Sequence, residues 1–83
     1  MTLEPKAVFY IDAGGNQVYM PGLSFDFEQY NGVETIQWGI FHQGHRIGQW
    51  CYTSRTQTAE LDLIPDISKR NWQVESVPIP CQL

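Results

Sequence analysis

The sequence predicts an all-β protein, built as a small antiparallel sheet or barrel of about five to six short strands. Turn-forming pairs recur roughly every ten residues, which is the spacing of short antiparallel strands; they are Gly14-Gly15, Pro21-Gly22, Asn31-Gly32 and Gln43-Gly44. No long segment carries apolar residues at helical spacing. The chain has 83 residues, of which 42% are hydrophobic and 17% charged, so we expect one globular domain over residues 1–83.

Two strands and a turn are expected near the N-terminus. Residues 7–12 and 17–20 are rich in apolar and aromatic side chains, and Gly14-Gly15 lies between them. This pattern predicts a β-hairpin.

A three-stranded meander is predicted over residues 23–54. Residues 23–27, LSFDF, alternate apolar and polar side chains as a half-buried strand does. Asn31-Gly32 favours a two-residue hairpin turn. Such a turn would pair Tyr30 with Val33, and further back it would pair Phe27 with Ile36, Phe25 with Trp38, and Leu23 with Ile40. Every apolar residue of the first strand would then meet an apolar residue of the second.

The third strand of the meander is expected to return across Gln43-Gly44, with His42 opposite His45. A regular ladder then pairs Ile40 with Ile47, Gly39 with Gly48, Trp38 with Gln49, and Ile36 with Cys51. The predicted core face carries Leu23, Phe25, Phe27, Ile36, Trp38, Ile40, Ile47 and Cys51, with Gln49 as its one polar member.

Three further elements complete the prediction. Apolar and polar side chains alternate over residues 59–63, which predicts a strand that ends before Pro65. Residues 66–70 are expected to form at most one short helical turn. Residues 72–77 read as a last strand, ended by Pro78 and Pro80 because proline cannot donate to a strand ladder.

The opposite face of the meander is the predicted binding surface. It would carry four aromatic side chains among polar ones, and aromatic side chains gathered on one face are not expected to remain exposed to water. The predicted site residues are Trp50, Tyr52, Tyr30, Gln37, Asp26, Glu28, Arg46 and Phe41. Trp50 and Tyr52 are the expected anchors.

Three interpretations of this face remain open. The N-terminal hairpin or the strand at Trp72 could cover it from within the chain. It could bind a protein, because aromatic residues and arginine are enriched at interface hot spots. It could bind a carbohydrate or another small polar ligand by stacking on Trp50 and Tyr52, with hydroxyl groups of the ligand bound by Asp26, Glu28 and Gln37. We expect a non-enzymatic module that acts by protein association, either as a homodimer or with a larger partner, and carbohydrate binding is the alternative.

Composition argues against several other classes. Five Lys and Arg residues and a net charge of −4 do not supply the basic footprint that nucleic-acid binding needs. No apolar run reaches the ~20 residues of a membrane span, and no signal peptide is recognisable, so we expect a cytoplasmic protein without membrane contact. No positioned nucleophile or phosphate-binding loop is evident, so neither an enzymatic activity nor a cofactor is predicted.

A metal site is the last alternative. His42, His45, Cys51 and Cys81 offer two imidazoles and two thiols, which zinc accepts. Six residues along one strand separate His45 from Cys51 by about 20 Å, too far for a shared ion. Metal binding would therefore be limited to the His42 and His45 hairpin tip, and no metal is predicted. The cysteines are expected to be free thiols.

Overall fold

The computed structural model describes residues 2–32, 34–67 and 69–79, which form seven strands and no helix. The strands are β1 (Thr2–Ile11), β2 (Gln17–Tyr19), β3 (Leu23–Asn31), β4 (Thr35–His42), β5 (His45–Thr53), β6 (Thr58–Leu63) and β7 (Gln73–Ile79). The all-β prediction is confirmed, with more strands than expected. No helix in this part of the chain could cross a membrane.

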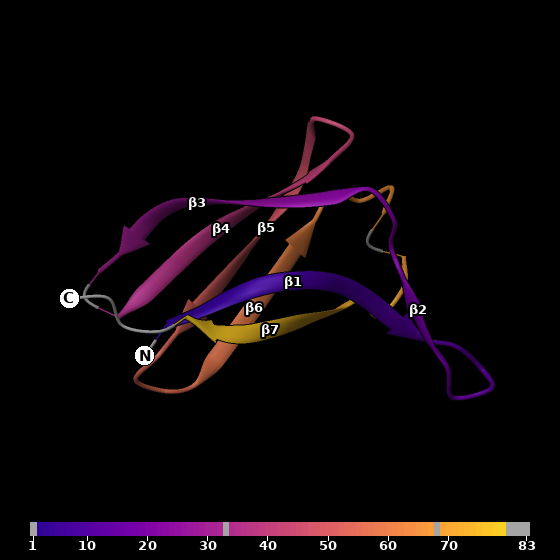
Figure 1. Cartoon of the computed structure of the whole chain (residues 1–83), viewed down its shortest axis with the longest axis horizontal. Helices are drawn as coiled ribbons and strands as arrows, with labels where there is room; N and C mark the ends of the chain where they lie inside the picture. The colour runs from indigo at the N-terminus through magenta and orange to yellow at the C-terminus, as the bar shows by residue number, and fades with distance from the viewer. Residues whose placement is uncertain (1, 33, 68, 80–83) are drawn as a thin grey trace.

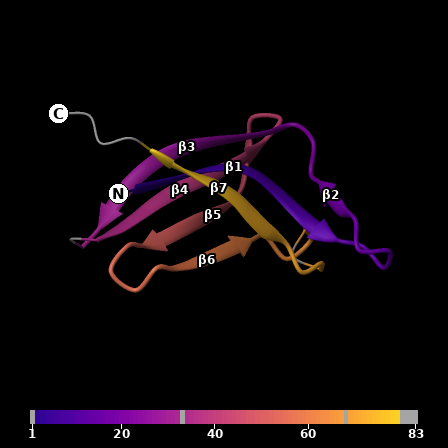
Figure 2. The same ribbon diagram turned by 60° about the horizontal axis from the view of Figure 1, so that its bottom comes forward.

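The strands form two open antiparallel sheets that pack face to face. One sheet has the order β2-β1-β7 and the other β3-β4-β5-β6. Strands β1 and β7 cross over β5 and β6 at an angle (Figure 1, Figure 2). The described strands do not close into a barrel, because β6 and β7 are both edge strands that do not pair with each other.

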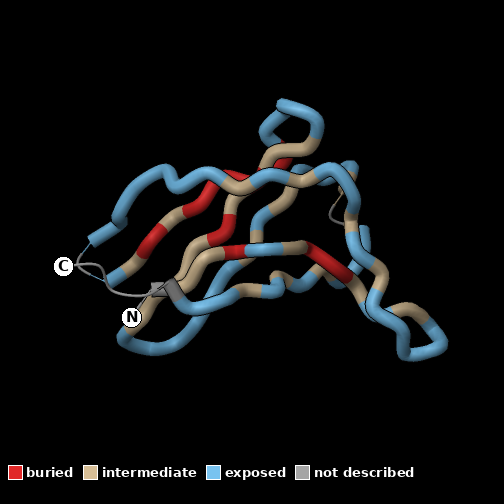
Figure 3. The backbone as a smooth tube through the Cα atoms, viewed as in Figure 1, coloured by how far each residue is buried: buried red, intermediate tan, exposed pale blue. Residues whose placement is uncertain are grey.

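The hydrophobic core lies between the two sheets. Its buried members are Val8 from β1 and Ile36, Trp38, Ile40, Ile47 and Trp50 from β4 and β5. Figure 3 shows the buried stretches on β1, β4 and β5. The two central strands of the larger sheet therefore supply most of the core.

The N-terminal hairpin has the predicted position. Ile11 pairs with Gln17, although β1 begins five residues earlier than the predicted strand. The Asp12 carboxylate accepts hydrogen bonds from the backbone N–H groups of Gly14 and Asn16, both at 2.9 Å. These bonds, with that from Asn16 the stronger, lower the pKa of Asp12. The turn is thus fixed by its own side chain.

The predicted register between β3 and β4 is wrong by two residues. The last pair before the loop is Asn31 with Thr35, and Gly32 has a φ of 75°. The connection is therefore longer than a two-residue turn, and position 33 lies outside the described residues. In the observed register Phe27 pairs with Trp38, Phe25 with Ile40, and Leu23 with His42. A shift of two keeps every side chain of residues 23–27 on its predicted face, because the strand period is two.

A bulge at Glu28 changes the face of the following residues. Phe27 pairs with Trp38 and Gln29 with Gln37, so Glu28 is the extra residue on β3. Tyr30 then pairs with Ile36 and lies on the core side of the sheet. The prediction that placed Tyr30 on the opposite face is wrong because a regular alternation was assumed.

A second bulge, at Ile47, has larger consequences. The tight turn is as predicted: Gln43 and Gly44 have φ values of 51° and 83°, and His42 faces His45. Beyond the bulge, Gly48 pairs with Ile40 instead of Gly39.

All later residues of β5 are therefore reversed relative to the prediction. Trp50 pairs with Trp38, Tyr52 with Ile36, and Cys51 with Gln37. Trp50 and Tyr52 face the core, whereas Gln49 and Cys51 face outward, which corrects the predicted core membership of Cys51.

The C-terminal elements follow the prediction in outline. Strand β6 ends before Pro65, and the Ile67 N–H donates to the Ile64 carbonyl at 2.9 Å in a turn. The described part of residues 66–70 forms turns and no helix. Strand β7 runs through Pro78, which pairs with Leu3, so Pro78 does not end it. An edge strand tolerates proline. Pro80 lies outside the described residues.

Candidate functional site

The structure divides the predicted binding surface between two faces. Asp26, Glu28, Gln37, Phe41 and Arg46 lie together on the outer face of the four-stranded sheet, as predicted. Tyr30, Trp50 and Tyr52 lie on the opposite, core-facing side. The prediction of one shared face is therefore wrong, and the bulges at Glu28 and Ile47 are the physical reason.

An ion pair organises the outer face. Arg46 donates from Nη2 to Glu28 Oε1 at 2.7 Å and from Nε to Oε2 at 3.0 Å. Gln37 donates to the same carboxylate at 2.8 Å. The Arg46 hydrogen bonds, followed by that from Gln37, lower the pKa of Glu28. Glu28 lies directly over Gly39, where a side chain would collide with it.

The hydrogen bonds continue across the outer face. Arg46 Nη2 also donates to Gln49 Oε1 at 3.3 Å, and Asn31 donates to Gln37 at 2.9 Å. The Cys51 sulfur is 3.9 Å from both Gln37 Oε1 and Gln49 Nε2. These polar side chains bond mainly to one another, so this face presents few groups prepared for a ligand.

The thiol on this face is poorly activated. Burial raises the pKa of Cys51 above its ordinary value, and the negative charges of Asp62, Glu60 and Glu28 raise it further. Only the thiolate is a strong nucleophile or metal ligand, so this cysteine is kept in its less reactive form.

The hairpin tip offers little for metal binding. His42 and His45 face each other across the Gln43-Gly44 turn. Among the described residues, no group of three or more His, Cys, Asp and Glu side chains could hold a metal ion. Cys81, the remaining candidate ligand of the metal alternative, lies outside these residues.

The three aromatic residues that lie on the core-facing side, Tyr30, Trp50 and Tyr52, have two different environments. Tyr30 is 63% exposed and meets Phe27 edge to face, with ring centroids 5.1 Å apart. Trp50 is only 4% exposed, and Tyr52 stacks on it with a centroid separation of 5.9 Å and an interplanar angle of 18°. Of the two expected anchor residues, Trp50 is therefore buried and Tyr52 is partly buried, and both line a groove.

This groove, the β6–β7 groove, opens between the edges of the two sheets and has a volume of about 400 Å³. Its apolar lining comes from both sheets and consists of Leu3, Trp50, Tyr52, Ala59, Leu61, Trp72 and Val74. Gln73 and Ser76 supply its polar lining. The alternation in residues 59–63 and the strand expected near Trp72 were visible in the sequence. Nothing in the sequence indicated that these two segments would lie across a groove from each other.

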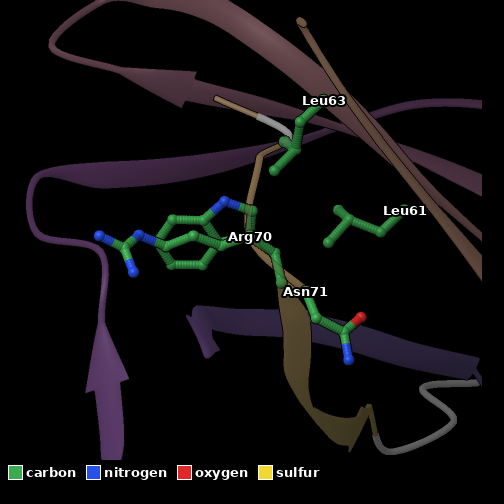
Figure 4. Close-up of a pocket in the computed structure, with 5 residues that line it drawn as sticks. Leu61, Leu63, Arg70 and Asn71 are labelled. Carbon is green, nitrogen blue, oxygen red and sulfur yellow. The ribbon is translucent and has the colours of Figure 1, made fainter. Parts of the chain in front are cut away.

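A smaller cavity of about 170 Å³ adjoins the groove, because Leu61 and Trp72 line both. Figure 4 shows Leu61 and Leu63 directed toward the segment that carries Arg70 and Asn71, with the Arg70 guanidinium pointing away from both leucines. Trp72 is held in place by a 2.7 Å hydrogen bond from its indole N–H to the Ile67 carbonyl. The wall of the groove at Trp72 is therefore preformed.

Both borders of the groove are edge strands. Directly after β6, the Ile64 N–H donates to the Ile47 carbonyl of β5 at 2.9 Å. In an antiparallel ladder this bond fixes which residues point their backbone groups at the neighbouring strand. The backbone groups of Glu60 and Asp62 point toward β5, and those of Ala59, Leu61 and Leu63 point away from it, to the side where no described strand pairs. The groove thus combines apolar side chains with a strand edge open for pairing.

No protein-family model matches this chain, and no curated protein or solved structure matches it either.

Proposed function

We propose that this protein is a non-enzymatic binding module that associates with another protein through the β6–β7 groove. The observation that carries the proposal is a groove of about 400 Å³ that is lined by aromatic and aliphatic side chains beside two polar ones and is bordered by two edge strands. Proteins commonly bind extended segments at such edges. Backbone hydrogen bonds then supply affinity, and pockets for alternate side chains supply specificity.

The residue types in the groove support a protein ligand. Three aromatic side chains, Trp50, Tyr52 and Trp72, line the groove, and aromatic residues are enriched at interface hot spots. Tyr52 and Trp72 are only partly buried and would supply most of the aromatic contact, because Trp50 is 4% exposed. Two of them are the expected anchors, now reached from the core side of the sheet. Tyr30 lies on β3, the far edge strand of the same sheet, and the other five predicted site residues lie on the outer face, so none of these six lines the groove. We therefore propose no role for them in binding at the groove, and their contact with a partner elsewhere stays a prediction.

The carbohydrate alternative has less support. A sugar needs polar side chains beside the aromatic ring on which it stacks, and Asp26, Glu28 and Gln37 were expected to supply them. These residues lie on the opposite face of the sheet from Trp50. One face of the Trp50 ring is also already covered by Tyr52. The non-enzymatic character and the cytoplasmic location stay predictions.

Selection from a library of displayed random peptides would test the proposal, followed by calorimetric titration of the selected peptides. Ala59 and Leu61 line the groove, so Ala59→Arg and Leu61→Lys would obstruct it. Tyr30→Lys is the matched control. It adds the same charge at an exposed position on β3, which is the far edge strand of the same sheet.

We expect either groove variant to weaken binding at least about tenfold, which is the loss from one obstructed anchor position. Tyr30→Lys should leave the affinity unchanged, and circular dichroism should show that all variants fold. Equal affinity in the folded groove variants, or a loss limited to Tyr30→Lys, would refute the proposal. Tryptophan fluorescence against a glycan panel would detect the carbohydrate alternative.

A further inference from the structure

We infer that the partner of the β6–β7 groove is an extended protein segment with alternating apolar and basic residues, which adds to β6 as a fifth strand of the four-stranded sheet. This inference rests on the proposed function and names the chemistry of the partner. Charge complementarity along the open edge of β6 carries it.

The two faces of β6 differ in chemistry. Ala59, Leu61 and Leu63 face the groove side, whereas Glu60 and Asp62 face the outside beside Cys51 and Gln49. A strand that pairs with β6 must alternate in the same way, because side chains of neighbouring strands share faces. Its inner residues would contact Leu61 in the groove, and its outer residues would lie beside Glu60 and Asp62.

The outer residues of β6 lie in a negative environment. Neither Glu60 nor Asp62 forms a salt bridge with any residue that the structure describes. Arg46, on the same outer face, is engaged by Glu28 at 2.7 Å. The raised pKa of Cys51, to which Asp62 and Glu60 both contribute after burial, reports the same negative charge.

Two further cations, from the segments before and after β6, are also engaged elsewhere. The Nε atom of Arg55, in the turn before β6, lies 3.6 Å from Glu34 Oε2. The Arg70 guanidinium stacks on the Tyr10 ring at 4.4 Å and points away from Leu61 and Leu63 (Figure 4). Lysine or arginine side chains of an added strand would therefore supply the positive charge that the β6 edge lacks.

The same charges oppose a second copy of this chain at β6. An antiparallel pair of β6 strands centred on Leu61 would place Glu60 of each copy opposite Asp62 of the other, and like charges in facing positions are destabilising. Pairing of β6 with β7 of another copy would bring Glu75, which shares the outer face of its own sheet with Tyr19, toward these acids. The charge pattern thus favours a basic partner over self-association.

The test uses the full chain and three capped nine-residue peptides. One alternates valine and lysine, one alternates valine and glutamate, and one alternates serine and lysine. Affinities are measured by calorimetry at low and high salt. We expect the valine–lysine peptide to bind at least about tenfold more tightly than the valine–glutamate peptide, since each facing charge pair adds to the difference. The serine–lysine peptide should bind weakly, because attraction to a chain of charge −4 is not sufficient without apolar contacts.

Two variants make the test specific. In the double variant Glu60→Lys with Asp62→Lys, the preference should reverse in favour of the valine–glutamate peptide. Asp26→Lys also replaces an acidic side chain by lysine, but on β3, the edge strand distant from the groove. This variant should still prefer the valine–lysine peptide. Amide exchange at Ala59, Leu61 and Leu63 should slow when the valine–lysine peptide binds, because an added strand protects their N–H groups.

The outcomes separate this inference from the proposed function. Equal binding of the valine–lysine and valine–glutamate peptides, or a preference that survives in the double variant, would overturn the basic partner. If Leu61→Lys still abolished binding of those peptides, the groove itself would stand. Suppose that neither valine peptide binds, while Leu61→Lys still weakens the binding of library-selected peptides. This result would overturn the basic partner and leave the proposed groove intact. A dimer in light scattering that Leu61→Lys dissociates would identify a second copy as the occupant and overturn the basic partner.

Discussion

Replacing Gly48 by alanine tests the direction in which the residues of β5 point after the bulge at Ile47. That bulge turns Trp50 toward the core. A Cβ atom at Gly48 would collide with the backbone carbonyl oxygen of Asp62 and would lie 2.8 Å from the Leu63 side chain. A regular register without the bulge would instead place Gly48 opposite Gly39, with the opposite face of β5 turned toward the core.

The expected loss of stability follows from these contacts. Backbone atoms of β6 cannot rotate away as a flexible side chain can, so the two strands must separate locally. Overpacking of this kind costs about 1–3 kcal/mol. The substitution of glycine by alanine also restricts the unfolded chain, which stabilises by about 0.4–1 kcal/mol. We expect a net loss of about 1–2 kcal/mol, or roughly 4–16 °C in Tm for a domain of this size.

Urea denaturation followed by tryptophan fluorescence would measure this loss, as a lower midpoint with an unchanged slope. Gly14→Ala is the matched control, because Gly14 lies in an exposed turn where the nearest atoms to an added Cβ belong to the flexible side chains of Asn16 and Asp12. It should change the stability by less than about 0.5 kcal/mol. Unchanged or increased stability of Gly48→Ala would show that Gly48 does not face β6 as it does in this structure, and the directions assigned to the following side chains of β5, including Trp50, would then fail.

Three further predictions concern single side chains. Trp50→Ala should lower the free energy of unfolding by about 3–5 kcal/mol in urea denaturation, because this side chain is only 4% exposed; a well-folded variant of normal stability would refute its place in the core. Glu28→Gln should cost about 0.5–1 kcal/mol at neutral pH through its ion pair with Arg46. The lowered pKa of Glu28 means that this contribution is present above the unfolded value of 4.5 and is lost as pH falls through the folded pKa. Denaturation curves of variant and wild type should therefore converge in acid, and a constant difference would contradict the assignment. Cys51, studied in a Cys81→Ser chain, should react with iodoacetamide several-fold more slowly at pH 8 than an unfolded thiol, because burial raises its pKa; equal rates in native and urea-unfolded protein would refute this.

Local patterns in the sequence determined most of the strands. The alternation of residues 23–27, the pair Gln43-Gly44 and the alternation of residues 59–63 each correspond to an observed strand or turn. These features depend on neighbours along the chain, which is why the sequence alone could specify them. The outer-face positions of Asp26, Glu28, Gln37, Phe41 and Arg46 were also predicted correctly, although not their hydrogen bonds.

Tertiary structure decided the faces and therefore the candidate site. A bulge inserts one residue without any distinctive sequence signal, and at Glu28 and Ile47 it reversed the face of the residues that follow. At Ile47 the second sheet supplies the reason, since burial of Trp50 and Tyr52 against β1 and β7 removes more apolar surface from water than burial of Gln49 and Cys51 would. The sequence by itself determined that this chain forms short antiparallel strands with aromatic residues to bury. Only the packing of the two sheets determined which aromatic residues are buried, and that β6 and β7 border an open groove, because these contacts join segments far apart in the chain.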